Sequence, residues 1–220
     1  MTKKELTKRY ILFLFSLFVS AIGVAITKKG ELGVSPVSSV ANILSIRFTF
    51  FSLGNWLIIW NCILILRQIV LLRKDFQLIQ LLQIPLSFLF GYFTDFGLWI
   101  FSSYTPKMYW ERISCVILGT AVLGCGIALS VIANVIMNSG EAFVKALSDT
   151  IRKDFGNVKI GFDISCVSLS IIMSLLFFRG TVMGTREGTI YAALFTGIMV
   201  KIFRKLLMPS VNRLLLEKGQ

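Results

Sequence analysis

Acidic side chains inside long apolar runs are the first candidates for chemistry in this chain. Asp163 lies about one turn into a run that begins at Lys159, and Asp95 follows Gly91 by one turn in another. Because charged side chains are costly inside a membrane, Asp163 is predicted to bind a cationic group or a proton, and Asp95 is predicted to line a binding site. The alternatives are an ion pair of Asp163 with Lys159, and for Asp95 a basic partner or contact with water.

A charged pair flanked by glycines precedes the last apolar run. Arg186 and Glu187 lie between Gly184 and Gly188. An arginine at a helix start can bind an anionic ligand together with the positive end of the helix dipole. The alternative is a salt bridge to Glu187 or Asp163, with glycines that let helices pack closely.

Two polar segments read as the starts of short helices. Ser35 precedes Pro36 and is followed by Ser38, and the segment from Asn138 to Glu141 resembles a capping box. In carriers with inverted repeats, such helix starts point at the substrate, which makes Ser35, Ser38 and Glu141 candidate binding residues. Ordinary capping of surface helices is the alternative, above all for the second segment.

The residue types exclude several kinds of site. The chain has no His, and its four cysteines form no CxxC pair. Neither a nucleophile motif nor a Gly-rich phosphate loop is present. We therefore predict no catalytic residue, no metal site and no cofactor, and we expect that the protein is not an enzyme.

Composition favours a membrane protein. Hydrophobic residues make up 55% of the chain and charged residues 15%, against about 25% charged in soluble domains. The net charge of +12 comes from basic residues in short gaps between apolar runs. Such a distribution is typical of loops beside lipid headgroups, so we expect a lipid bilayer as partner and no nucleic acid.

Six apolar stretches are long enough to span a bilayer, which predicts an all-α, polytopic transmembrane bundle. Between spans one and two, and between spans four and five, lie shorter helices that do not cross. The predicted spans are Tyr10–Thr27, Leu53–Leu72, Leu78–Phe101, Ile113–Met137, Lys159–Phe178 and Thr189–Leu207, and the short helices fall in Gly33–Phe50 and Ser139–Phe155.

The distribution of basic residues predicts the orientation. Sixteen of the 23 Lys and Arg residues fall on the side of the N-terminus if six spans alternate. The positive-inside rule then places both termini in the cytoplasm. The first run is followed by Thr27, Lys28 and Lys29 rather than by a cleavage site, so we expect it to remain as a helix.

The two halves of the chain resemble one another. Within a single transmembrane domain, 1–220, we expect repeat halves 10–101 and 113–207. Each half would hold three spans and a short helix, so the second half would enter the membrane from the opposite side, as an inverted-topology repeat. The matching pairs are Gly23 and Gly126, Leu44 and Leu147, Gly54 and Gly156, Asn61 and Asp163, Arg73 and Arg179, and Gly91 and Gly197. Through its match to Asp163, Asn61 joins the candidate substrate-binding residues.

Several segments together resemble the YczE/YyaS/YitT family of bacterial membrane proteins. They are Leu32–Ser39, Gln80–Ser87, Gly91–Asp95, Val158–Asp163 and Gly184–Ile190, which occur in the family's order over nearly the whole chain. The resemblance implies a polytopic protein of the bacterial cytoplasmic membrane that is suspected of transport. It supplies no substrate.

Three functions are compatible with these features. The first is a transporter of a small solute or ion that works by alternating access around a pseudo-symmetric central site. The second is a substrate-binding membrane subunit of a multi-component uptake system, and the third a membrane sensor or accessory protein. In each case the small residues Gly184, Gly188, Ala192 and Thr196, one per turn, could support a homo-oligomer.

Overall fold

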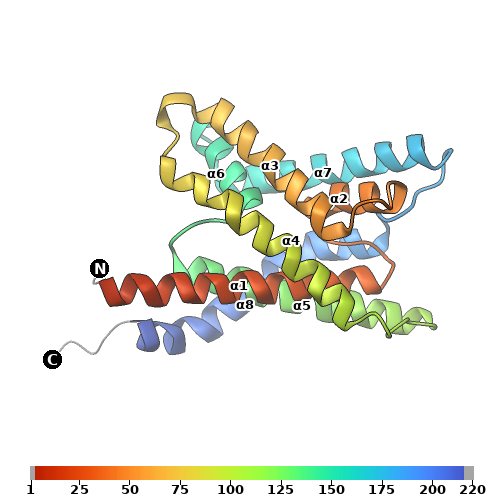
Figure 1. Ribbon diagram of the computed structural model, residues 1–220, viewed down its shortest axis with the longest axis horizontal. Coiled ribbons are helices and arrows are strands. Elements are labelled where there is room, and N and C mark those ends of the chain that lie inside the picture. Colours follow the sequence, from red (N-terminus) through yellow and green to blue (C-terminus); the bar gives the residue numbers. More distant parts are fainter. Residues whose placement is uncertain (1–2, 216–220) are drawn as a thin grey trace.

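Long apolar runs in this chain form helices, because a backbone in lipid must satisfy its hydrogen bonds within its own segment. The computed structural model describes residues 3–215, and this part of the chain is all-α. Its elements in order are α1 (Lys3–Lys29), α2 (Pro36–Arg47), α3 (Leu53–Leu72), η1 (Arg73–Asp75), η2 (Leu78–Leu82), α4 (Gln83–Ile100), α5 (Tyr109–Ala133), α6 (Ser139–Ile151), α7 (Phe155–Phe177) and α8 (Glu187–Leu215), as Figure 1 shows.

Five of the predicted spans coincide with helices that are long and apolar enough to cross a membrane. They comprise α1, α3 with η1, η2 with α4, α5, and α7. The predicted sixth span, Thr189–Leu207, lies within α8, which is not among the five. Lys201, Arg204 and Lys205 make this segment more polar than the others. The protein is thus a multi-pass membrane protein, with five candidate spans among the residues that the structure describes.

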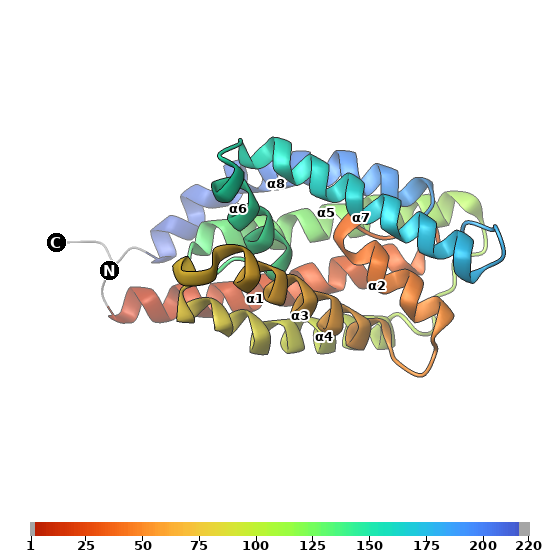
Figure 2. The same cartoon turned by 90° about the horizontal axis from the view of Figure 1, so that it is seen from above.

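Successive long helices run in alternating directions along the bundle (Figures 1 and 2). As a result, α1 begins at the end of the bundle where α8 finishes, and the connection from α3 to α4 lies at this same end. Lys218, which contributes to the predicted orientation, lies outside the described residues.

The outward face of the bundle is rich in large apolar side chains. Val70, Trp99 and Leu176 are each 70% to 74% exposed. Exposing such side chains to water is unfavourable, whereas in lipid they are in their preferred solvent. The surface therefore agrees with a surrounding bilayer.

Helices α1 and α5 cross closely at the centre of the bundle. A Cβ atom on Gly23 would overlap the backbone of Leu123, and one on Gly126 would lie 2.6 Å from the backbone nitrogen of Ser20. Glycine at these positions lets the two backbones approach, which is how helices gain packing energy in lipid. This crossing fixes the long axis of the molecule.

The short helices α2 and α6 are packed inside the bundle. Figure 2 shows both between α3 and α7, and each contacts those two helices. Val40 and Ala41 of α2 are buried, as is Val144 of α6. The sequence predicts α6 on the surface because Lys145 and Asp149 line one side of it. Only that side is exposed, while its first turn is buried.

The predicted third span begins with a break. Its first residues form the 3-10 helix η2, and α4 starts at Gln83. Pro85 therefore lies in the first turn of α4, where a missing backbone N–H costs no helical hydrogen bond. The helix type changes from 3-10 to α just before Pro85.

Candidate functional site

An ion pair between Lys159 and Asp163 lies in the first half of α7. Lys159 Nζ is 2.5 Å from Asp163 Oδ1, and the two side chains are only 26% and 18% exposed. Asp154 starts the helix by accepting hydrogen bonds from the backbone N–H groups of Gly156 and Asn157. The lysine follows one turn later and Asp163 one turn after that, so both side chains share a helical face.

Glu141 joins this pair from the first turn of α6. Its Oε2 is buried and has no hydrogen-bond partner among the described residues. Burial raises the pKa of the Glu141 carboxyl above its ordinary value, and the nearby charge of Lys159 lowers it in part. The charge of Asp163 also acts on Glu141 and raises its pKa. Two carboxyl groups thus share one lysine.

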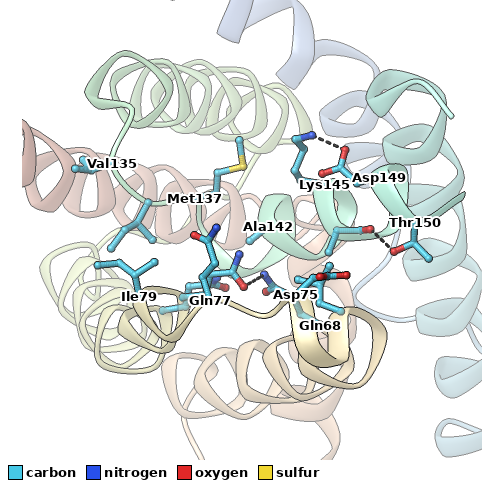
Figure 3. A pocket seen from close by; sticks show the side chains of 15 residues that line it. Gln68, Asp75, Gln77, Ile79, Val135, Met137, Ala142, Lys145, Asp149 and Thr150 are labelled. Carbon is cyan, nitrogen blue, oxygen red and sulfur yellow. Dashed lines mark hydrogen bonds and ion pairs between the residues drawn. The ribbon is translucent and has the colours of Figure 1, made fainter. Parts of the chain in front are cut away.

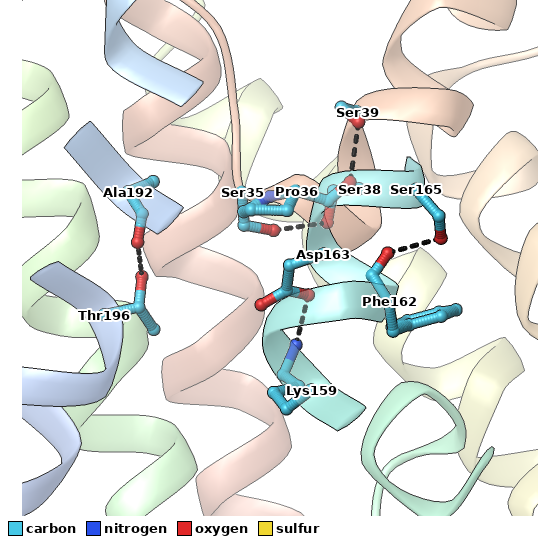
Figure 4. Close-up of polar contacts among 10 residues, drawn as sticks. All are labelled: Ser35, Pro36, Ser38, Ser39, Lys159, Phe162, Asp163, Ser165, Ala192 and Thr196. Atoms are coloured by element: carbon cyan, nitrogen blue, oxygen red, sulfur yellow. Dashed lines mark hydrogen bonds and ion pairs between the residues drawn. The ribbon is translucent and has the colours of Figure 1, made fainter. Parts of the chain in front are cut away.

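The start of α2 lies next to this group, as Figure 4 shows for Ser35, Ser38 and Asp163. Ser35 Oγ donates a hydrogen bond to Ser38 Oγ at 3.0 Å. The hydroxyl of Ser39 lies 3.5 Å from the backbone oxygen of Cys166, which ties α2 to α7 just beyond Asp163. The backbone N–H groups at a helix start have no partner within the helix and can meet a ligand.

We call Glu141, Lys159 and Asp163, with Ser35 and Ser38, the central acidic site. With both carboxyl groups ionised it carries one net negative charge in a partly buried setting. Such a site can bind a proton or a small cation, and protonation of one carboxyl would neutralise it. Besides Asp163, the central acidic site contains three other predicted site residues: Ser35, Ser38 and Glu141.

Asn61 lies elsewhere in the core. It is 4% exposed on α3, and its Nδ2 has no hydrogen-bond partner in the part of the chain that the structure describes. The described contacts do not join it to Asp163. Its predicted role as the counterpart of Asp163 in the first half stays a prediction.

Asp95 caps a helix at the far end of the bundle. Its carboxylate accepts hydrogen bonds from the backbone N–H of Gly54 at 2.8 Å and from Ser52 Oγ at 2.5 Å. The negative charge is favourable there, because the first N–H groups of α3 need acceptors. Asp95 therefore fastens α4 to the start of α3 and lies apart from the central acidic site.

Arg186 and Glu187 are also outside that site. Arg186 Nε is 3.5 Å from Glu187 Oε2, with both side chains close to half exposed. Glu187 also accepts a hydrogen bond from the hydroxyl of Tyr109 at 3.2 Å. The observed contact is the local salt bridge that the sequence offered as the alternative to anion binding.

A comparison with protein families identifies the chain at family level. The profile of a family of unknown function, DUF6198, matches residues 7–205. The chain belongs to this family. No curated protein and no solved structure matches the chain.

The match to DUF6198 spans every candidate site residue, from Ser35 to Glu187. It also covers all five segments on which the resemblance to the YczE/YyaS/YitT family rests. No named relative links the two families.

The sequence does not indicate two buried polar features of this DUF6198 member. Lys28 Nζ donates to Asn42 Oδ1 at 2.5 Å, and Asn42 Nδ2 donates to the backbone oxygen of Gly184 at 2.7 Å. Gln68, only 1% exposed, lies inside the bundle at the end of α3. A lysine that follows an apolar run reads as a loop residue, and a glutamine near a helix end as a headgroup contact. Only packing with distant helices buries them.

In the described part of the chain, no group of three or more Cys, Asp or Glu side chains is arranged to hold a metal ion. Within the central acidic site, Lys159 pairs with Asp163, and its positive charge also acts on Glu141.

Proposed function

We propose that the protein transports a small solute or ion across the membrane by alternating access around the central acidic site. The observation that carries the proposal is Glu141, whose carboxyl is buried with one oxygen unpaired beside the Lys159–Asp163 pair. A membrane protein has little structural use for such a group, whereas a carrier can use it to take up and release a proton or cation.

The lysine suggests how binding and release alternate. When Glu141 is protonated, Lys159 is free to remain with Asp163; when Glu141 is ionised, the two carboxylates compete for Lys159 or recruit a cation. The occupancy of the site then changes the charges between α2, α6 and α7, the elements that would have to move.

We further propose that the two halves form an inverted-topology repeat. Helix starts support it: Ser35 and Asn138 are 103 positions apart, and they precede α2 and α6 with φ of −57° and −61° and a shared ψ of 151°. Ser52 and Asp154, 102 positions apart, both cap the following helix with a side-chain oxygen.

Helix ends support the repeat as well. Arg73 and Arg179, matched in the sequence, have φ of 48° and 52°, and Glu31 and Asn134, 103 positions apart, have φ of 56° and 49°. Left-handed backbone is uncommon for residues other than glycine. Its occurrence at two matched pairs of positions is an expected product of one ancestral unit.

The contacts between the halves are reciprocal. Gly23 contacts Leu123. The residues at the matching positions, 103 apart, are Gly126 and Ser20, and these two also contact one another. Likewise α2 packs on α7 and α6 on α3. Exchanged contacts of this kind are those that a two-fold axis produces.

One difference between the halves suggests the alternating states. In the first half Gly54 and Gly91 bring α3 and α4 into contact, whereas the matched Gly197 has no atom near the place of a Cβ. Gly156 meets only its neighbour Asp154. In the opposite state α7 and α8 would close through Gly156 and Gly197, and α3 and α4 would separate.

The finer topology belongs to the same proposal. With α8 as a sixth span, both termini lie on one side, and the excess of Lys and Arg places that side in the cytoplasm of a bacterium. A common origin with the YczE/YyaS/YitT family would account for the five shared segments.

Transport by the purified protein tests the proposal. Vesicles that contain the protein are incubated with a mixture of small metabolites and salts, and their contents are read by mass spectrometry. We expect at least one solute to accumulate over vesicles without protein, and Asp163→Asn and Glu141→Gln to abolish the accumulation. Glu31→Gln, exposed beyond the end of α1 and outside this site, is the control and should transport normally.

Two results would count against this function. If the variants at Asp163 and Glu141 fold and transport like the native protein, the central acidic site has no part in transport. If no solute enters vesicles unless a separate ATPase subunit is present, the protein is a substrate-binding subunit of a larger uptake system.

A further inference from the structure

A second polar site is formed where the end of α3, the start of α4 and the exposed side of α6 meet. A cavity of about 500 Å³ lies there, within the size range of small-molecule sites. Figure 3 shows it closed on one side by the connection that carries Asp75 and Gln77 and on the other by α6. Glu141, Lys159 and Asp163 are not among its lining residues.

Two buried glutamines with unpaired side-chain oxygens are among the residues that line this cavity. Gln68 and Gln83 line it and are 1% and 2% exposed, yet neither Oε1 has a hydrogen-bond partner among the described residues. Gln68 Nε2 donates to Gln80 Oε1, another lining atom, at 3.2 Å. An unsatisfied buried polar atom is rare in native proteins because it loses its hydrogen bonds to water. Both oxygens keep free acceptor capacity, which a ligand whose N–H donors reach them would satisfy.

The charges at the cavity are acidic on balance. Asp75 and Asp149 line it together with a single basic residue, Lys145. Lys145 Nζ is 2.5 Å from Asp149 Oδ1, so the lysine is neutralised and the charge of Asp75 is left over. In a chain with a net charge of +12, a local acidic excess favours a positively charged ligand.

The opposite wall is apolar. It is formed by Val135, Ile136 and Met137 of the connection between α5 and α6, and by Ala142 and Ala146 of α6. A short aliphatic chain would bury its methylene groups against this wall, while groups at its ends reach the glutamines and Asp75.

We propose that this glutamine cavity binds a small organic cation, with amine or guanidinium N–H donors on a short aliphatic chain. The N–H groups satisfy Gln68 and Gln83, the positive charge pairs with Asp75, and the aliphatic part contacts the apolar wall. The proposal concerns binding at a site distinct from the central acidic site, and it holds whether or not the protein is a transporter.

Three probes of equal length test the chemistry: 1,5-diaminopentane, 1,5-pentanediol and glutarate. Each is titrated into the purified protein in detergent, and binding is followed by calorimetry and by the shift of the unfolding temperature. We expect the diamine to bind and to raise the unfolding temperature, the diol to bind at least tenfold more weakly, and glutarate not to bind. Equal binding of diol and diamine, or no binding of the diamine, would overturn the proposal.

Variants locate the site. Gln68→Leu and Gln83→Leu keep the side-chain size and remove the unpaired oxygen, so each should weaken diamine binding at least tenfold. Gln83→Leu should also raise the unfolding temperature without ligand, whereas Gln68→Leu also removes the donor to Gln80 Oε1. Asp75→Asn, on the exposed rim, should weaken binding of the diamine and leave binding of the diol unchanged. Ser114→Ala on α5 serves as control. Diamine binding that is unchanged in Gln83→Leu and in Asp75→Asn contradicts the assignment.

Discussion

The carboxyl group of Glu141 illustrates how position gives a residue its chemistry. In the sequence it is the fourth member of a segment that resembles a capping box, yet it is Asn138 Oδ1 that accepts the hydrogen bond from the backbone N–H of Ser139. Glu141 instead faces the interior, where burial raises its pKa and Lys159 opposes that effect. Asp95 shows the converse, since an acid within an apolar run serves as a helix cap.

Glu141 should make stability depend on pH. Because its pKa is raised in the folded state, the folded protein holds the proton more tightly than the unfolded chain does. The contribution to the free energy of unfolding is therefore complete below the ordinary glutamate pKa of about 4.3 and is lost as the pH rises through the raised pKa. Thermal unfolding in detergent between about pH 4 and 8 measures it.

Glu141→Gln should flatten that pH profile, because glutamine does not titrate. Lys159 and Asp163, the charged groups whose effect reaches Glu141, remain in both proteins. Asp149→Asn is the control and should keep the slope of the native protein. A Glu141→Gln profile as steep as that of the native protein would show that another group is responsible.

Asp95→Ala should lower the free energy of unfolding by about 1 kcal/mol, a typical cost of a lost helix cap. The N–H of Gly54 and the hydroxyl of Ser52 lose their acceptor, so the loss is structural. We expect transport per folded molecule to be kept. A loss of transport with unchanged stability would show that Asp95 takes part in substrate binding.

At the scale of the elements, glycine decides which helices pack. The α1–α5 crossing depends on glycines that a side chain would disrupt, and the contact of α3 with α4 depends on Gly54 and Gly91. Hydrophobic patterning does not determine which helix faces pack together, since lipid is as apolar as the helix faces themselves. Close shape fit therefore sets the arrangement of the spans.

Gly126→Ala should destabilise the protein by about 1 to 3 kcal/mol, the usual cost of overpacking. Its new Cβ would lie 2.6 Å from the backbone nitrogen of Ser20, which cannot move without shifting α1. Gly161→Ala on α7 is the matched control, because nothing outside its own stretch of helix backbone lies within 4 Å of its Cβ position. The unfolding temperatures of the two variants should differ clearly, and equal values would refute the packing argument.

At the scale of the whole molecule, the open face between α7 and α8 contrasts with the closed contact of α3 and α4. This contrast predicts motion if the halves exchange conformations. Spin labels at the exposed positions Ile160 and Leu194 would report the α7–α8 distance, and labels at Leu66 and Phe88 the α3–α4 distance. Lowering the pH, which protonates Glu141, should shift the two distances in opposite directions.

Gly197→Leu provides the control for this motion. The position is open in the structure, so the variant should fold normally, but the larger side chain would block closure of α7 on α8. We expect its α7–α8 distance to stay long at every pH. If the two distances in the native protein do not change, or change together, the exchange of conformations is wrong.

The sequence by itself determined the long helices and much of where they begin. Apolar length defines a span because lipid offers no hydrogen bonds to the backbone. Local signals such as Ser35 before Pro36 indicate α2, because a helix start needs a cap and tolerates proline. The pairing of Asp163 with Lys159 is also local, since the two residues are one helical turn apart, and the sequence therefore offers it as an alternative.

Only the tertiary structure decided what those helices enclose. Asp95 caps a helix through Gly54, 41 positions earlier in the chain. Glu141 is buried against another helix, and Gln68, Gln80 and Gln83 line one cavity. These groupings depend on how backbones fit at glycine contacts and at the ends of short helices. Hydropathy reports the transfer of each segment into lipid and holds no information on which segments then meet, so the sites emerge from packing.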